Sequence, residues 1–234
     1  VDVKFLGSYP NAARNPSIGG TRQTSRGRAG SAGKKFKPIR SVGVCGLGLI
    51  GGSLASALRP LDAMRVRGYD VDPKTRRDAR SAGIECVSSL PHLISGSDLI
   101  VVATPIQTTE KIIADLSPHL SRSQIVTDVG SFKAPVLHAA RRLLPADVPF
   151  IGGHPMAGSE RSGFAASRAD LFRGSSWALI SDEGVDRSAL LRVSHLIGRI
   201  GARVIPIRAE AHDAAVSLIS HLPHVIAYSL MAYA

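Results

Sequence analysis

A glycine-rich turn between an apolar run and a helical pattern constrains the fold of this chain more than any other feature. The apolar residues 41–45 are followed by the pattern GxGxxG, and a helical pattern then covers residues 51–58. In such a turn the first glycine permits the tight bend, the second lets the backbone approach a pyrophosphate, and the third lets the helix pack closely on the strand. The amide groups at the start of the helix attract phosphate. We expect the contacting residues to be Gly46, Gly48, Leu49, Ile50 and Gly51.

An acidic residue at the end of the next strand narrows the choice of ligand. The second apolar run, residues 65–70, ends in Asp70, which lies 19 residues beyond Gly51. A carboxylate at this position accepts hydrogen bonds from the adenosine ribose and repels a 2′-phosphate. Strand, glycines and acid together predict a Rossmann-type domain that binds NAD in preference to NADP, although the nearby Arg76 and Arg77 would weaken that preference. The alternative is a structural role, in which the glycines form an ordinary turn and Asp70 caps the following helix.

From residue 41 onward, short apolar runs alternate with helical patterns, as in a chain with right-handed crossovers and a mainly parallel sheet. Continuous runs of Val, Ile and Leu are typical of strands covered by helices on both faces. The expected strands are residues 41–45, 65–70, 99–103, 124–128, 150–152, 177–180 and 203–206. The expected helices are residues 51–58, 73–82, 108–120, 133–144, 186–200 and 210 to the end.

The last part of the sequence, from residue 210 onward, is one long helical pattern with no strand after it. Neither a cap nor a breaker ends this pattern, so we interpret it as the opening of an all-helical C-terminal domain that is truncated here. The expected fold class is therefore α/β, a Rossmann-type sheet followed by the start of a helical domain. We expect a disordered basic tail at 1–37, an NAD-binding domain at 38–207 and the incomplete helical domain at 208–234.

The positive charge of the chain is concentrated in its first residues. Nine of the 29 Lys and Arg residues but only one of the 18 acidic residues lie in residues 1–40, which therefore carry +8 of the net charge of +11. This Gly-, Ser- and Arg-rich stretch has too few large apolar side chains to fold alone. A disordered or non-native extension, an organelle-targeting segment and a nucleic-acid contact are the three interpretations of it. Because the rest of the chain is nearly balanced, we expect no nucleic-acid partner.

Hydropathy and cysteine content indicate the compartment. The sequence lacks the run of roughly 18 apolar residues that a membrane span requires, so we expect no membrane association. Two cysteines, Cys45 and Cys86, are too few to crosslink a domain, and their spacing matches no metal site. We therefore expect no metal, no disulfide and a cytoplasmic location.

Polar residues follow several expected strands at their carboxyl ends, where parallel sheets bind ligands. Thr104 and Pro105 come after residues 99–103, and Thr104 either lines the nicotinamide-ribose pocket or forms an ordinary turn. Ser131 follows the run 124–128, and its structural interpretation is the N-cap of the next helix. His154 lies in a loop rich in glycine, which leaves room for a ligand beside the imidazole. Histidine is the usual acid–base group near neutral pH.

Six motifs occur in a defined order between residues 41 and 234, namely GLGLIGGS, GYD, ATP, DVGSFK, GGHPMAGSE and AHD…SHLPH. Together they resemble the prephenate dehydrogenase family, which includes the arogenate and cyclohexadienyl dehydrogenases. GGHPMAG and SHLPH are far more specific than the glycine turn. The resemblance implies NAD-dependent oxidative decarboxylation of prephenate to 4-hydroxyphenylpyruvate in tyrosine biosynthesis, with oxidation of arogenate to tyrosine as the alternative.

The resemblance also implies roles for individual residues. His154 corresponds to the base that takes the proton of the substrate hydroxyl, and Ser131 to the residue that holds both the hydroxyl and His154. His221 and His224 of SHLPH correspond to groups that bind substrate and nicotinamide, and packing of helices is the alternative role for them. Glu160 corresponds to an acid in a polar network at the pocket entrance; taken alone it would be a solvated loop residue. The family binds the ring carboxylate with an arginine of the helical domain, which this sequence does not reach.

The family's helical domain is also its dimer interface, so the resemblance implies a homodimer. A different class of function is a non-catalytic NAD-binding or sensing protein, which would need the glycine turn and Asp70 but no substrate geometry. The arrangement of Ser131 and His154 relative to the nicotinamide position discriminates between these two hypotheses.

Overall fold

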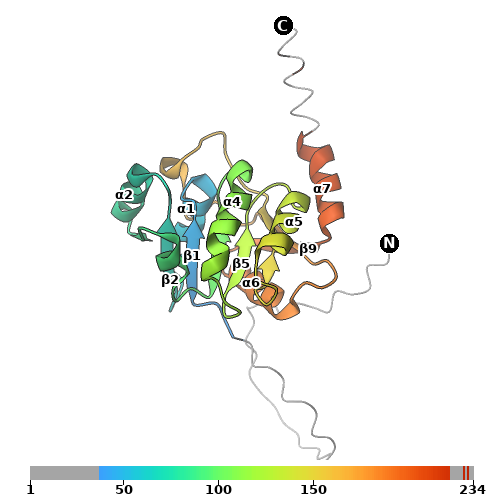
Figure 1. Ribbon diagram of the computed structural model, residues 1–234. Coiled ribbons are helices and arrows are strands. Elements are labelled where there is room, and N and C mark those ends of the chain that lie inside the picture. Colours follow the sequence, from blue (N-terminus) through green and yellow to red (C-terminus); the bar gives the residue numbers. More distant parts are fainter. Residues whose placement is uncertain (1–36, 222–228, 230, 232–234) are drawn as a thin grey trace, which may run out of the picture. The chain divides into compact units, whose positions relative to one another are not determined.

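The structure is a computed structural model, and it describes residues 37–221 together with residues 229 and 231 (Figure 1). Six parallel strands form the main sheet in the order β3-β2-β1-β4-β5-β6. This order, with the first strand near the centre and crossovers to either side, is that of a Rossmann-type sheet. The strands are β1 Ser41–Cys45, β2 Arg65–Tyr69, β3 Glu85–Cys86, β4 Leu99–Val102, β5 Ile125–Asp128 and β6 Phe150–Ile151.

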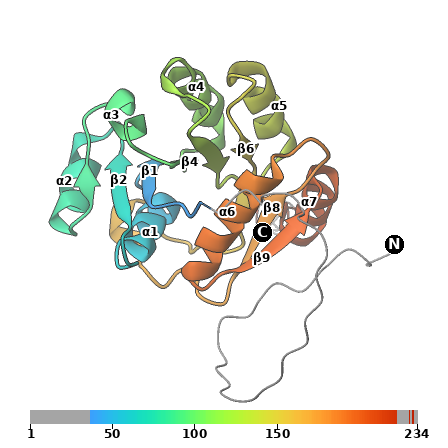
Figure 2. The ribbon, with the colours of Figure 1, turned by 90° about the horizontal axis from the view of Figure 1, so that it is seen from below.

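Helices cover both faces of this sheet, with α1 and α6 on one side and α3, α4 and α5 on the other (Figure 2). Successive residues of the central strands belong alternately to the cores on the two faces of the sheet. Val42, Val44 and Val101 belong to the core beneath α1 and α6, whereas Ile100 and Val102 pack with α3 and α4. The helices are α1 Leu49–Leu58, α2 Pro73–Ser81, α3 Leu90–Ile94, α4 Ile106–Leu116, α5 Ala134–Leu143, α6 Arg187–Arg199 and α7 Ala209–Val216. The expected parallel sheet with two covered faces is confirmed.

A second sheet of three strands contains the last two expected strands. It has the order β7-β8-β9, formed by β7 Gly153–Pro155, β8 Ser176–Ile180 and β9 Arg203–Ile207. The pairing of β7 with β8 is antiparallel, and that of β8 with β9 is parallel. The prediction of a loop around His154 is therefore wrong, because β7 follows β6 after one residue and pairs with β8. Glycine and proline obscured this strand in the sequence, since both are unfavourable in strand interiors.

Two further elements were not expected from the sequence, β3 and the five-residue helix α3. Both are too short to show a period of 2 or 3.6 residues. They nevertheless complete one edge of the sheet, where Arg67 and Gly68 pair with Glu85 and Cys86. The guanidinium of Arg67 donates to the backbone oxygen of His92 at 2.8 Å, which holds α3 against β2.

The start of the described chain is joined to the sheet. Ile39 is a buried core residue, and the ammonium of Lys37 lies 3.8 Å from the carboxylate of Asp98. At the other end, α7 continues as a π-helical turn, Ser217–His221. The rest of the expected terminal helix, and the tail up to residue 36, lie outside the described residues. In the described part of the chain no helix is both long and apolar enough to span a bilayer.

Candidate active site

The main sheet brings four strand ends into one row. Cys45 pairs with Tyr69 on one side and with Val102 on the other, and Val102 pairs with Asp128. The residues that follow these strands therefore share the carboxyl edge of the sheet, which is where α/β sheets bind ligands. Burial is the main cause that raises the pKa of the Cys45 thiol to about 12, with Asp70 adding to the effect. This thiol stays protonated and packs as an apolar side chain.

The glycine turn has the backbone geometry that its sequence predicts. Gly46 adopts a φ of +94°, and a Cβ there would lie 2.5 Å from the backbone oxygen of Ala103. A Cβ at Gly51 would lie 1.9 Å from the backbone oxygen of Gly46, so only glycine lets α1 start this close to the turn. Gly48 is the N-cap of α1 without a side-chain cap, and a Cβ there would meet nothing within 4 Å. The start of α1 therefore offers backbone amides beside an open space, as a phosphate-binding helix does.

Asp70 lies at the end of β2 and is turned toward the glycine turn. Its carboxylate accepts hydrogen bonds from the amide of Leu47 at 2.8 Å and from the amide of Asp72 at 2.9 Å. The alternative that Asp70 caps α2 is wrong, because Asp72 caps it by accepting from the amides of Lys74 and Thr75. The carboxylate of Asp70 thus lies next to the predicted phosphate loop, in the position expected for a ribose-binding acid.

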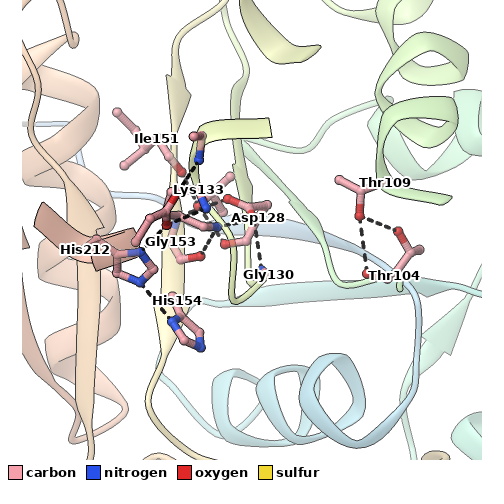
Figure 3. Close-up of polar contacts among 12 residues, drawn as sticks. Thr104, Thr109, Asp128, Gly130, Lys133, Ile151, Gly153, His154 and His212 are labelled. Carbon is pink, nitrogen blue, oxygen red and sulfur yellow. Dashed lines mark hydrogen bonds and ion pairs between the residues drawn. The ribbon is translucent and has the colours of Figure 1, made fainter. Parts of the chain in front are cut away.

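The end of β4 adjoins the same turn. The methyl carbon of Thr104 would lie 3.1 Å from a Cβ added at Gly46. Pro105 is the N-cap of α4, and Thr109 donates to its backbone oxygen at 3.1 Å. The hydroxyls of Thr104 and Thr109 are 3.5 Å apart (Figure 3). Thr104 and Pro105 therefore combine an ordinary helix start with a place beside the dinucleotide loop.

A buried ion pair joins the end of β5 to the start of β7. The Lys133 ammonium, whose side chain is fully buried, contacts the Asp128 carboxylate and donates to the backbone oxygen of Gly153 at 2.6 Å. Asp128 in turn accepts from the amides of Gly130 at 2.9 Å and Gly153 at 3.1 Å. Burial lowers the pKa of Lys133, and the charge of Asp128 opposes that shift. Sequence reasoning missed this pair, because no spacing rule links a strand end to the residue before a helix.

His154 lies on β7 directly after Gly153, the residue that the ion pair contacts, and it is half-buried. Its Nδ1 is 3.0 Å from Nε2 of His212, and the two rings meet edge to face (Figure 3). His212 lies on α7 and is 1% exposed, and its Nδ1 is 2.8 Å from the carboxylate of Asp213. Both residues belong to the motif AHD, from which the sequence alone predicted no role for His212 or Asp213. Their separation of almost 60 residues from His154 left only that motif as a possible signal.

The structure corrects the prediction that Ser131 caps α5. Helix α5 has Lys133 at its N-cap without a side-chain cap. Instead, the carboxylate of Asp213 accepts from the amides of Lys133 at 2.9 Å and Ala134 at 2.8 Å. Burial raises the pKa of Asp213, but hydrogen bonds from Ala134, His212 and Lys133 outweigh it, so the net pKa is lowered. Ser131 is exposed in the loop between β5 and α5.

The remaining predicted residues are exposed or lie outside the described part. Glu160 is exposed in the loop after β7, and its carboxylate is 3.7 Å from Nε of the equally exposed Arg161. The side chain of His221 and the whole of His224 lie outside the described residues, so their predicted roles stay predictions. The loop carrying Glu160 leads back to α1, where the Arg168 amide donates to the Ser53 hydroxyl at 2.9 Å.

This fold and edge geometry define a class, the dinucleotide-binding α/β domains with a histidine beside the carboxyl edge of the sheet. Comparison with known proteins specifies the family. The model of the prephenate dehydrogenase nucleotide-binding domain matches residues 54–206, and that of the prephenate dehydrogenase dimerization domain matches residues 208–234. The chain therefore belongs to the prephenate dehydrogenase family.

Individual relatives agree with this assignment. The prephenate dehydrogenase of Bacillus subtilis (strain 168) is 33% identical over 192 residues, which are 80% of this chain and 52% of that protein. The structure of Aquifex aeolicus prephenate dehydrogenase with hydroxyphenyl propionate and NAD+ superimposes with a TM-score of 0.78 at 31% identity, covering 85% of this chain and 70% of that one. Synechocystis arogenate dehydrogenase gives a TM-score of 0.75 at 33% identity, over 82% and 68% of the two chains. The present chain thus spans about half the length of the Bacillus relative.

Proposed function

We propose that this chain is the cofactor-binding part of an NAD-dependent dehydrogenase that converts prephenate to 4-hydroxyphenylpyruvate and CO2. The observation that carries the proposal is the placement of His154. The backbone beside His154 is tied to the end of β5 by Asp128 and Lys133, so the imidazole is held beside the edge that carries the glycine turn. A base and a dinucleotide loop at one edge are what removal of a hydride and a proton from one alcohol requires.

NAD is the cofactor that the site favours, and when bound it accepts the hydride. The glycine turn and the start of α1 would hold its pyrophosphate, and Asp70 its adenosine ribose. The Aquifex relative contains NAD+, which supports the same choice here. The carboxylate of Asp70 would repel the 2′-phosphate of NADP.

The proposed reaction gives a role to each of the predicted substrate-site residues. His154 takes the proton of the ring hydroxyl while that carbon loses its hydride, which makes a carbonyl. The carbon–carbon bond to the ring carboxylate then breaks, CO2 leaves, and the bonding electrons enter the ring as it becomes aromatic and the oxygen regains a proton. Ser131 would hold the hydroxyl and His154 together, and Glu160, His221 and His224 would line the substrate pocket.

The match of residues 208–234 to a dimerization domain supports a homodimer formed by the helical domain.

The test is an assay of the full-length protein with each substrate and NAD, followed by the absorbance of NADH. Formation of NADH and 4-hydroxyphenylpyruvate from prephenate supports the proposal. Turnover of arogenate alone would assign the alternative activity, which the Synechocystis relative favours. If NAD binds but neither substrate is oxidised, the protein is a non-catalytic NAD-binding member of the family and the proposal is wrong.

A further inference from the structure

Three ionisable side chains from two distant parts of the chain form a continuous hydrogen-bonded series. The carboxylate of Asp213 is 2.8 Å from Nδ1 of His212, and Nε2 of His212 is 3.0 Å from Nδ1 of His154. Figure 3 shows the His212 ring, on α7, meeting the His154 ring on its strand. The two rings form a T-shaped pair with centroids 5.2 Å apart and planes at 77°. This geometry determines which ring nitrogens carry protons.

The carboxylate of Asp213 determines which atom donates and which accepts in both hydrogen bonds of the series. Asp213 accepts from two backbone amides at the start of α5 in addition to His212, and an ionised carboxylate only accepts hydrogen bonds. His212 must therefore carry its proton on Nδ1. A neutral imidazole carries one proton, so in neutral His212 the unprotonated nitrogen is Nε2.

The protonation of His212 determines which nitrogen of His154, the proposed base, carries a proton. An unprotonated Nε2 on His212 accepts from Nδ1–H of His154, so the neutral His154 ring has its basic nitrogen at Nε2. The proton that His154 gains during the reaction is then stabilised by Asp213 through His212, as a carboxylate stabilises an imidazolium in other acid–base sites. His212 contacts the base at Nδ1, the nitrogen other than the basic one, and Asp213 contacts His212.

We propose that His212 and Asp213 are positioning residues that hold His154 in the Nδ1–H tautomer, so that Nε2 acts as the base. The proposal rests on the proposed function insofar as it assigns that base a reaction. It also links the base to the domain junction, because both residues lie on α7, within residues 208–234 that match the dimerization domain. The same Asp213 caps α5, the helix preceded by the buried Lys133. One carboxylate thus fixes both the orientation of the base and the position of a neighbouring helix.

The first experiment reads the tautomer without any turnover. The full-length protein is labelled with 15N-histidine, and the nitrogen shifts of His154 are assigned by comparison with His154→Asn. The proposal predicts a protonated Nδ1 and an unprotonated Nε2 near neutral pH. A proton on Nε2 of His154 and none on its Nδ1 would overturn the proposal. Because no substrate is present, this result stands whether or not prephenate proves to be the substrate.

The second experiment separates positioning from packing by a pair of variants at one residue. His212→Leu keeps an apolar volume but removes the acceptor, whereas His212→Gln places an amide oxygen near the position of Nε2. We expect His212→Leu to lower kcat by about 10- to 100-fold, by analogy with the loss of an outer partner of a metal-bound histidine, with the Kd for NAD unchanged. His212→Gln should recover most of that loss. His138→Gln, at an exposed position on α5, is the matched control and should behave as the wild type.

Substitution of the carboxylate provides a sharper contrast. In Asp213→Asn the amide group can donate to Nδ1 of His212, which would reverse both hydrogen bonds and place a proton on Nε2 of His154. We expect kcat to fall by roughly 10⁴-fold, as it does when an aspartate that orients a catalytic histidine is replaced by asparagine, and the 15N spectrum to show the reversed tautomer. An unchanged tautomer in Asp213→Asn, or wild-type kcat in His212→Leu, would exclude the positioning role while leaving the proposed reaction intact.

Discussion

At the scale of single residues, the imidazole of His154 is the group whose removal tests the chemistry most directly. His154→Asn keeps a polar side chain of similar reach but has no basic nitrogen. We expect kcat to fall by about 10²–10⁴-fold, the usual contribution of a general base. The Kd for NAD should not change, because the glycine turn and Asp70 are intact. Steady-state kinetics with prephenate, together with NAD titration, measure both quantities, and an unchanged kcat would remove His154 from the mechanism.

Two glycines of the same turn give opposite predictions for the same substitution. Gly48→Ala places a methyl group where the protein has no atom within 4 Å, so we expect normal stability and weaker NAD binding. Gly51→Ala drives a methyl group to 1.9 Å from the backbone oxygen of Gly46, so we expect a large loss of stability. Overpacking of this kind costs about 1–3 kcal/mol or more.

Thermal unfolding and NAD titration of both variants separate these effects. Gly48→Ala with wild-type affinity would mean that the pyrophosphate does not approach Gly48. Gly51→Ala with wild-type stability would mean that α1 does not start as close to the turn as the structure shows.

At the scale of elements, side chains at the ends of strands and helices join neighbouring elements to one another. Asp98, at the start of β4, accepts from the amides of Arg40 and Ser41 and from the Ser41 hydroxyl, so it fixes the beginning of β1. Burial raises the pKa of Asp98, but these hydrogen bonds outweigh it, and the net pKa is lowered. A carboxyl with a lowered pKa stabilises the fold above its unfolded pKa and loses that contribution as pH falls through its folded pKa.

Asp98→Asn is therefore expected to destabilise the protein in a pH-dependent way. Loss of a charged acceptor that serves three donors should cost about 1–3 kcal/mol at neutral pH. The difference from the wild type should shrink below about pH 4, where the wild-type carboxyl begins to gain its proton. Urea unfolding at stepwise lower pH measures the difference. Asp62→Asn, at an exposed position, is the control, and a difference that does not change with pH would contradict the explanation.

The start of α5 shows why some element ends could not be predicted. A serine two residues before the expected start of a helix is a reasonable candidate for its cap, yet Asp213 from α7 performs the capping. The sequence contains both residues, but only the folded chain brings α7 to the end of α5. Asp72 at the start of α2 is the opposite case, because that cap is local and its residues are adjacent in the sequence.

At the scale of the whole molecule, residues 1–36 carry +6 of the net charge of +11. Removing residues 1–36 deletes seven of the 29 basic residues and one of the 18 acidic ones, which lowers the net charge from +11 to +5. Because the joined region starts with Lys37 and Ile39, we expect the melting temperature and the Kd for NAD to be unchanged.

Differential scanning calorimetry and NAD titration of the shortened protein measure these two quantities. Salt-dependent binding to duplex DNA that disappears on the same deletion would contradict our expectation of no nucleic-acid partner. A lower melting temperature would show that the first 36 residues contribute to the core.

The sequence by itself determined the main sheet, the glycine turn and the family, because these depend on local periodicity and on motifs of adjacent residues. The alternation of apolar strands and helices predicted a parallel sheet, and Gly46, Gly51 and Asp70 predicted the turn that the structure contains. The motif GGHPMAG also singled out His154. Leu47 in the turn and Asp70, which are joined by a hydrogen bond, are only 23 positions apart.

Only the tertiary structure decided how His154 is held. The second sheet places it on a strand instead of a loop, and the buried Asp128–Lys133 pair fixes the backbone beside it. His212, 58 residues away, contacts its ring and is itself bonded to Asp213. No local pattern encodes such contacts, since a hydrogen bond between distant residues depends on where whole elements pack. The nitrogen that can act as a base is therefore a property of the fold, although the histidine itself is visible in the sequence.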